Sequence, residues 1–140
     1  MTSIGDSWEE VKNELFSNEE IIEIENNAAR MKKILLDEEI TAITDRIIKQ
    51  LSPLRIYLFG SFADGSFKED SDYDFYIVVD DRNSDWYDQT TQAYHAIRSI
   101  RTKPVDVLVA INSTFEKRIK HPSIEREVFQ KGILLYEQNT

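Results

Sequence analysis

The chain has 140 residues, of which 41% are hydrophobic and 31% charged, so it fits one globular domain with a short appendage rather than a disordered segment. It contains no cysteine, which excludes disulfides, thiolate metal sites and thiol catalysis. The net charge of −9 disfavours tight binding to long nucleic acid, because an acidic surface repels phosphate backbones.

The beginning of the chain does not have the pattern of a targeting sequence. Residues 1–10 lack the basic segment and the apolar core of a secretory signal. No apolar run elsewhere approaches the length that crosses a membrane. We therefore expect the protein in the cytoplasm.

Residues 1–39 are expected to form an N-terminal helical extension. Ser7 to Glu10 has the pattern of a capping box, with Trp8, Val11 and Leu15 at helical spacing, and Ser17 to Glu20 repeats the box. The helix that follows the second box carries an apolar stripe. This stripe either packs on its own domain or docks another subunit, which includes a homo-oligomer formed through these helices. Its apolar residues step by three and four along one helix face: Ile21, Ile24, Ala28, Met31 and Leu35.

The middle of the chain predicts a helix followed by two strands. Asp37 is expected to cap a helix that ends before Pro53. Branched and aromatic residues then predict a strand over 55–59, a helical turn from Ser61 and a second strand over 73–79. The buried face of the helix is expected to consist of Ile40, Ile43, Ile47 and Leu51.

The remaining residues continue the alternation of helices and strands. After a turn at 80–83, Ser84 or Asp85 is expected to cap a helix to about Ser99, and a strand follows over 105–111. A short helix capped by Asn112, Ser113 or Thr114, a helix from Pro122 to about Gln130 stopped by Gly132, and a strand over 133–136 complete the chain. This order predicts an α/β or α+β fold, with a small sheet covered by helices.

Residues 58–79 contain the parts that phosphate chemistry requires. An apolar run ends at Gly60 and Ser61, where backbone N–H groups can approach an anion closely. Asp72 and Asp74 open the next strand, and side chains two residues apart on a strand point to the same face. Two carboxylates on one face repel each other unless a cation lies between them, and Mg²⁺ prefers such oxygen ligands.

Asp106 is the third carboxylate of interest. It interrupts an otherwise apolar strand, where a charged side chain needs a partner or a metal ion. An ion pair with Lys103 or Arg101 would satisfy it without any function. Together with Asp72 and Asp74, a metal site of three carboxylates is the better explanation.

These residues resemble the nucleotidyltransferase superfamily of the DNA polymerase beta type. The resemblance covers about residues 40–137 and is greatest to its minimal, stand-alone bacterial members, the MNT-type proteins, which are often antitoxin partners of HEPN-domain toxins. It implies a polymerase-beta-like fold, a small mixed sheet flanked by helices, in a nucleotidyltransferase domain of residues 40–140. The residues that carry it are Gly60, Ser61, Asp72, Asp74 and Asp106 in their spacing, with the closing segment 125–136.

The resemblance also implies roles for these residues. Gly60 and Ser61 would hold the β and γ phosphates of a nucleotide, and Asp72 and Asp74 would bind Mg²⁺. Asp106 would complete a second metal position and act as, or assist, the base for an attacking hydroxyl. The implied activity is transfer of a nucleoside monophosphate from a nucleoside triphosphate, with ATP as the first candidate, to a hydroxyl acceptor with release of pyrophosphate.

One position departs from the pattern and keeps a second function open. Many minimal members carry arginine where this chain has Asp64, so an anion replaces a cation beside the expected phosphate site. Lys68 or Lys103 would have to supply the positive charge instead. The alternative is therefore an antitoxin-like binding module that neutralises a HEPN-type toxin with weak or no catalysis.

Overall fold

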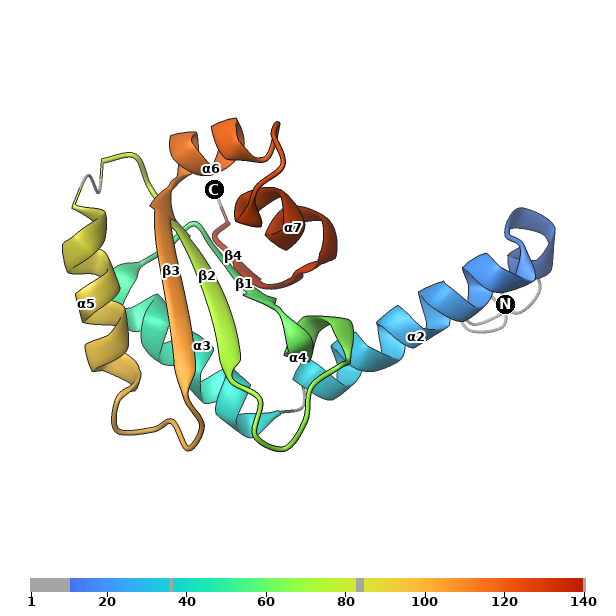
Figure 1. Cartoon of the computed structure of the whole chain (residues 1–140), viewed down its shortest axis with the longest axis horizontal. Coiled ribbons are helices and arrows are strands. Elements are labelled where there is room, and N and C mark those ends of the chain that lie inside the picture. Colours follow the sequence, from blue (N-terminus) through green and yellow to red (C-terminus); the bar gives the residue numbers. More distant parts are fainter. Residues whose placement is uncertain (1–10, 36, 83–84, 140) are drawn as a thin grey trace. The chain divides into compact units, whose positions relative to one another are not determined.

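The structure is a computed structural model that describes residues 11–35, 37–82 and 85–139 (Figure 1). It divides into two compact units, residues 1–34 and residues 35–140, which we describe separately. The predicted boundary between residues 39 and 40 remains a prediction. No helix in the described ranges is both long and apolar enough to span a membrane.

The first unit is helical, as predicted. The helix expected around Trp8 falls partly outside the described residues, of which residues 11–15 are helical. The second capping box is present: the Ser17 N–H donates to Glu20 Oε1 and the Glu20 N–H donates to Ser17 Oγ, both at 3.2 Å. The helix that follows is α2 (Asn18–Leu35).

The apolar stripe predicted along α2 is not a continuous buried face. Ile21 is buried, whereas Ile24 and Ala28 are exposed. The side chains of Met31 and Leu35 lie outside the described part. The helical spacing therefore predicted the helix but not which of its residues are covered.

The second unit is built on one mixed sheet with the strand order β3-β2-β1-β4 (Figure 1). Its strands are β1 (Arg55–Phe59), β2 (Tyr73–Val79), β3 (Val105–Ile111) and β4 (Ile133–Glu137). β1 runs antiparallel to β2 and to β4, whereas β2 and β3 are parallel. Parallel strands need a long crossover, which α5 (Trp86–Ile97) supplies. The predicted α+β class with a small mixed sheet is confirmed.

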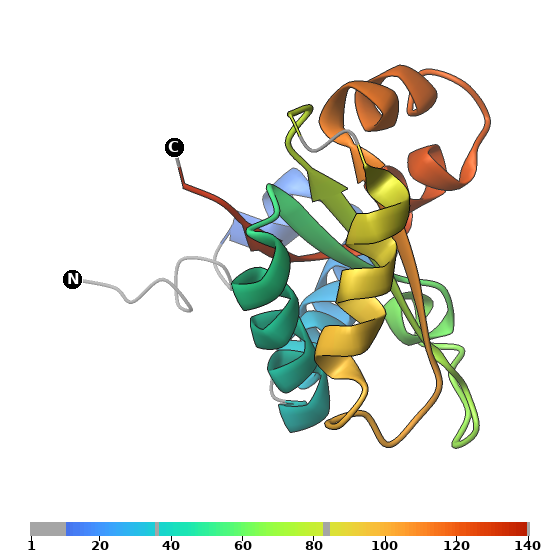
Figure 2. The same cartoon turned by 90° about the vertical axis from the view of Figure 1, so that its left-hand side faces the viewer.

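Two helices lie side by side on one face of the sheet, α3 (Glu38–Leu51) and α5 (Figure 2). Asp37 caps α3 as predicted, since its Oδ1 accepts the N–H groups of Glu39 and Ile40 at 3.0 Å. The helix ends at Ser52, which is left-handed, directly before Pro53. The core on this side contains Ile43, Ile47, Ile56, Leu58, Phe75, Ile77, Ala93 and Ile97, all fully buried.

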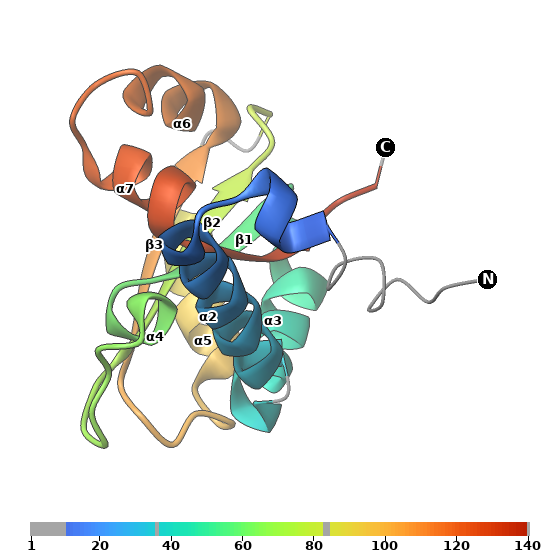
Figure 3. The same cartoon turned by 90° about the vertical axis from the view of Figure 1, so that its right-hand side faces the viewer.

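The opposite face of the sheet is partly covered by α6 (Asn112–Arg118) and α7 (Ile124–Lys131), which lie next to each other (Figures 1 and 3). They pack on a second cluster that contains Tyr57, Tyr76, Val78, Phe115 and Val128. Side chains alternate along a strand, so Asp74 belongs to the same face as Tyr76 and Val78.

Some predicted boundaries and caps differ from the structure. The helix α5 ends at Ile97 rather than near Ser99. The prediction that Asn112, Ser113 or Thr114 caps α6 is wrong: the strand β3 leads straight into the helix, whose side-chain acceptor comes from Asp81, to which the Ser113 N–H donates at 2.8 Å. Ile111 occupies the N-cap position, and its apolar side chain cannot accept a hydrogen bond, so an acceptor from a neighbouring turn takes this role.

Gly132 ends α7 as predicted, but for a different reason. Its backbone is extended rather than left-handed. A Cβ at this position would collide with the Val128 carbonyl oxygen and lie 3.2 Å from the Leu58 carbonyl oxygen. The glycine is therefore required by close packing between α7 and β1.

Candidate active site

Asp74 and Asp106 lie side by side on the face of the sheet that carries α6 and α7. They are register partners of the parallel pair β2 and β3, so their side chains leave the sheet on the same face. Asp72 is exposed and directly precedes β2, two residues before Asp74. In the described part of the chain, no ion pair joins Asp106 to Lys103 or Arg101, which donate to the backbone carbonyls of Glu69 and Lys103.

Gly60 brings the turn after β1 against the same carboxylates. Phe59, the last residue of β1, pairs with Asp74. Gly60 has a φ of 73°, in the left-handed region that side chains rarely adopt, and a Cβ there would collide with Asp74 Oδ2. Both observations explain why a glycine stands between β1 and Ser61.

Asp74 is electrostatically strained in the absence of a cation. Burial, which is the largest cause, acts together with the nearby carboxylates of Asp106 and Asp72 to raise its pKa from 3.8 to about 6. A positive charge beside these carboxylates would reduce their repulsion, because it lowers the free-energy cost of keeping two neighbouring carboxylates ionised.

Ser61 begins the short helix α4 (Ser61–Asp64), which follows Gly60 directly. The N–H groups of Ala63 and Asp64 donate to the Gly60 carbonyl oxygen at 3.1 Å. Those of Ser61 and Phe62 have no protein acceptor among the described residues. This turn therefore presents backbone donors next to the carboxylate pair.

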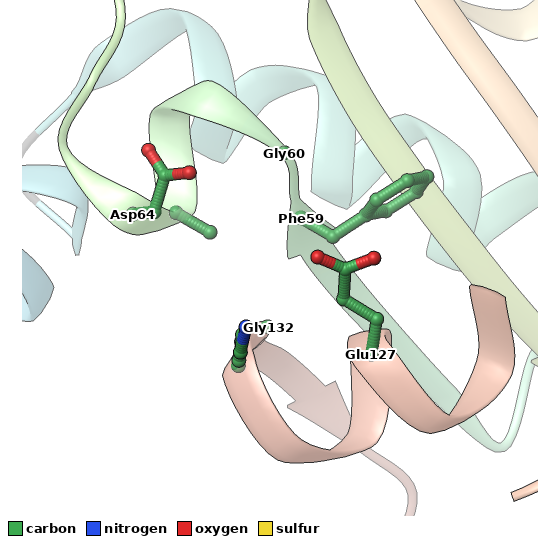
Figure 4. A pocket seen from close by; sticks show the side chains of 7 residues that line it. Phe59, Gly60, Asp64, Glu127 and Gly132 are labelled. Carbon is green, nitrogen blue, oxygen red and sulfur yellow. The ribbon is translucent and has the colours of Figure 1, made fainter. Parts of the chain in front are cut away.

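Asp64 lines the hollow that adjoins Gly60 (Figure 4). Its Oδ1 accepts the N–H and the hydroxyl of Ser66, at 2.8 and 2.6 Å, so the carboxylate stabilises the turn after α4. The hollow measures about 40 Å³ and lies between Gly60 and Gly132. Figure 4 shows the Glu127 carboxylate directed toward Phe59 and Gly60.

The two lysines considered as substitutes for the missing arginine are differently placed. Lys103 donates to the Glu69 carbonyl oxygen at 2.6 Å and lies 5.7 Å from the centre of the Phe62 ring. Lys68 is exposed, and its backbone N–H donates to Ser71 Oγ. Lys131 of α7 lines the hollow beside Gly60, a position that spacing along the chain could not indicate.

The family of the chain follows from comparison with known proteins. Residues 41–140 match the family model described as "Polymerase beta, Nucleotidyltransferase". The chain belongs to this nucleotidyltransferase family. The resemblance noted in the sequence is thus confirmed, and the matched residues include all five positions that carry it.

Two solved structures are similar to parts of this chain at low identity. One is a candidate nucleotidyltransferase from Sulfolobus solfataricus, with 15% identity, a TM-score of 0.49, and coverage of 80% of this chain and 87% of that chain. The other is a toxin–antitoxin structure with AMP-PNP, with 20% identity, a TM-score of 0.46, and coverage of 73% and 75%. No curated protein matches the chain.

The carboxylates of this nucleotidyltransferase domain are suited to a divalent cation but are not drawn together into a finished site. Among the described residues, no three histidine, aspartate or glutamate side chains are close enough together to hold a metal ion. Asp74 and Asp106 nevertheless supply adjacent hard oxygen donors, with Asp72 two residues away, which is the donor chemistry of Mg²⁺. The strained carboxyl of Asp74 is the observation that favours a cation there.

Sequence reasoning missed one residue that contacts both the start of β2 and the turn before β3. Glu39 lies in the first turn of α3 and accepts hydrogen bonds from Tyr73 and Thr102. A glutamate in a first turn usually complements the helix dipole, and periodicity carries no further signal.

Proposed function

We propose that this chain is a Mg²⁺-dependent nucleotidyltransferase that moves a nucleoside monophosphate from a nucleoside triphosphate, ATP first among them, to a hydroxyl acceptor. One observation carries the proposal: Asp74 lies beside Asp106 and against Gly60, so that carboxylates and backbone donors meet at one corner of the sheet. Its membership of the polymerase beta nucleotidyltransferase family supports the same reaction class.

The residues of the site would have different roles in the reaction. Asp72, Asp74 and Asp106 would hold Mg²⁺, which when bound would neutralise charge on the triphosphate and on the leaving pyrophosphate. The free N–H groups at Ser61 and Phe62 would bind oxygens of the β and γ phosphates. Gly60 allows this turn to reach the carboxylates, because any side chain there would collide with Asp74.

The transfer itself needs one base that takes the proton of the attacking hydroxyl. The acceptor's hydroxyl oxygen forms a bond to the α-phosphorus, the bond from that phosphorus to the bridging oxygen breaks, and pyrophosphate leaves with the electron pair. Asp106 would take the hydroxyl proton, since it is exposed and lies next to Asp74. The acceptors to be compared are a tyrosine of a partner protein, a small alcohol such as an aminoglycoside, and an RNA end, the last disfavoured by the acidic composition.

The test is release of pyrophosphate from Mg-ATP together with the intact mass of each acceptor. The wild-type chain should release pyrophosphate and add one nucleoside monophosphate, and Asp74→Asn and Asp106→Asn should abolish both signals. Asp70→Asn is the matched control, because Asp70 is an exposed aspartate in the loop just before the site. Turnover that survives in Asp74→Asn would refute the assignment.

A second candidate is an antitoxin-like module that neutralises a HEPN-type toxin by docking. The observation that favours it is exposed apolar surface in the helical first unit, where Leu15 and Ile22 are 67% and 58% exposed. Copurification from the native host would identify a partner. If a variant with Asp72→Asn and Asp74→Asn neutralises that partner as well as the wild type, docking and not catalysis is the mechanism. Loss of neutralisation in this variant, with docking retained, would favour catalysis.

A further inference from the structure

Glu39 connects the start of β2 with the turn that leads into β3, and it lies outside the candidate site. Its carboxylate accepts the hydroxyl of Tyr73 at 3.3 Å and the hydroxyl of Thr102 at 2.8 and 2.9 Å, and it also accepts the Thr102 N–H. Figure 1 shows where these parts meet, at the end of the sheet where α3, β2 and β3 begin.

One side of this connection is the start of β2. Tyr73 stands between Asp72 and Asp74, and its ring is buried on the opposite face of the strand from Asp74. Fixing the Tyr73 hydroxyl therefore fixes the backbone from which both aspartates project. The Tyr73 N–H also donates to the Pro104 carbonyl oxygen at 3.0 Å, which ties the start of β2 to the residue before β3.

The other side is the turn that leads into β3. Thr102 lies four residues before Asp106, and its backbone and side chain are both held by Glu39. The next residue, Lys103, donates to the Glu69 carbonyl oxygen and lies over the Phe62 ring of α4. The turn is thus attached to α3, to the loop before β2 and to the helix that begins at Ser61.

We propose that Glu39 is a positioning residue, which holds the starts of β2 and β3 in the register that places Asp74 beside Asp106. This inference rests on the proposed function, because it assigns Glu39 to the geometry of the metal-binding pair. Glu39 touches neither carboxylate, so it acts through Tyr73 and Thr102. Partners that orient metal ligands in this way typically change metal affinity by 10–100-fold when removed.

The hydrogen bonds favour a charged Glu39. Partial burial acts to raise its pKa, but the hydrogen bonds from Thr102, Lys103 and Tyr73 outweigh burial and lower the pKa below the ordinary value. A neutral glutamine can accept fewer of these bonds, and its amide group would face the Thr102 donors in one orientation. A graded loss from Glu to Gln to Ala is therefore expected.

The experiment measures Mg²⁺ affinity by calorimetry and pyrophosphate release on the full chain. Glu39→Ala should weaken Mg²⁺ binding about tenfold and Glu39→Gln about threefold. The turnover that is lost should return at high Mg²⁺. Glu38→Ala is the matched control, since Glu38 is also an acidic residue in the first turn of α3 but is exposed. Circular dichroism confirms that each variant is folded, and Thr102→Ala and Tyr73→Phe separate the two sides of the connection.

The outcomes distinguish this inference from the proposed function. A wild-type chain that binds no Mg²⁺ and forms no product overturns both. A wild-type chain that binds Mg²⁺, with Glu39→Ala binding it equally well, overturns the role of Glu39 and leaves the proposed function intact. Equal losses in Glu39→Ala and Glu38→Ala would also overturn it, because the helix dipole and not the connection would then be responsible.

Discussion

The strained carboxyl of Asp74 leads to a prediction about stability that does not depend on any substrate. Replacing Asp74 by asparagine removes the charge but keeps the shape, so it should stabilise the metal-free protein at neutral pH. The pKa of Asp74 rises from 3.8 to about 6 in the folded chain. A carboxyl group whose pKa is higher in the folded chain than in the unfolded chain binds its proton more tightly in the folded state. Its contribution to the free energy of unfolding is fully present below pH 4 and is lost as the pH rises toward 6 and beyond.

The magnitude follows from the shift. About two pKa units correspond to about 3 kcal/mol at 1.36 kcal/mol per unit, and partial exposure of Asp74 reduces this to about 1 kcal/mol after solvent screening. Asp74→Asn should therefore gain about 1 kcal/mol at pH 7.5 and nothing at pH 4. Urea unfolding in EDTA and low salt at pH 4, 6 and 7.5 measures this difference.

The same urea unfolding series includes a control substitution and defines the outcome that would contradict the prediction. Asp70→Asn also removes one exposed negative charge and should show no gain between pH 4 and 7.5. Mg²⁺ should stabilise the wild type at pH 7.5 and have little effect on Asp74→Asn. If Asp74→Asn is equal to or less stable than the wild type at pH 7.5, Asp74 is not electrostatically strained and the argument for a cation at this corner fails.

Three further substitutions test the packing around the site. Gly60→Ala should lower pyrophosphate release more than 100-fold while circular dichroism stays native, because its Cβ would displace Asp74; unchanged release would contradict this. Tyr76→Phe should lower the free energy of unfolding in urea by about 1–2 kcal/mol, because the buried Glu125 loses the hydroxyl that donates to it at 2.8 Å. An unchanged urea midpoint would show that Glu125 finds another donor. Gly132→Ala should lower the free energy of unfolding by about 2 kcal/mol in the same assay, because its Cβ would meet two carbonyl oxygens. An unchanged free energy of unfolding would mean that α7 can shift.

Local patterns were sufficient wherever neighbouring residues decide the structure. The strands 55–59, 73–79 and 105–111 and the cap at Asp37 were all predicted correctly from the sequence. These features depend on side-chain alternation, β-branched and aromatic content, prolines and capping side chains, all of which act over a few residues.

Interactions between distant residues were the ones that sequence reasoning missed. Asp81 supplies the acceptor at the start of α6 from a turn more than 30 residues earlier in the chain, in place of a local cap. Glu39 and Thr102, separated by 63 residues, share hydrogen bonds that no spacing rule describes. Lys131 reaches the hollow beside Gly60 only because α7 packs against β1.

The amino-acid sequence alone specifies which chemical groups are available for function: carboxylates at 72, 74 and 106, a glycine and a serine after the first strand, and no thiol. Alternation along β2 also determined that Asp74 faces away from Tyr73. The parallel pairing of β2 and β3, in the register that sets Asp74 next to Asp106, is visible in the folded chain and not in local sequence patterns. This pairing depends on the crossover through α5 and on packing of both sheet faces, which are interactions between residues far apart in the chain.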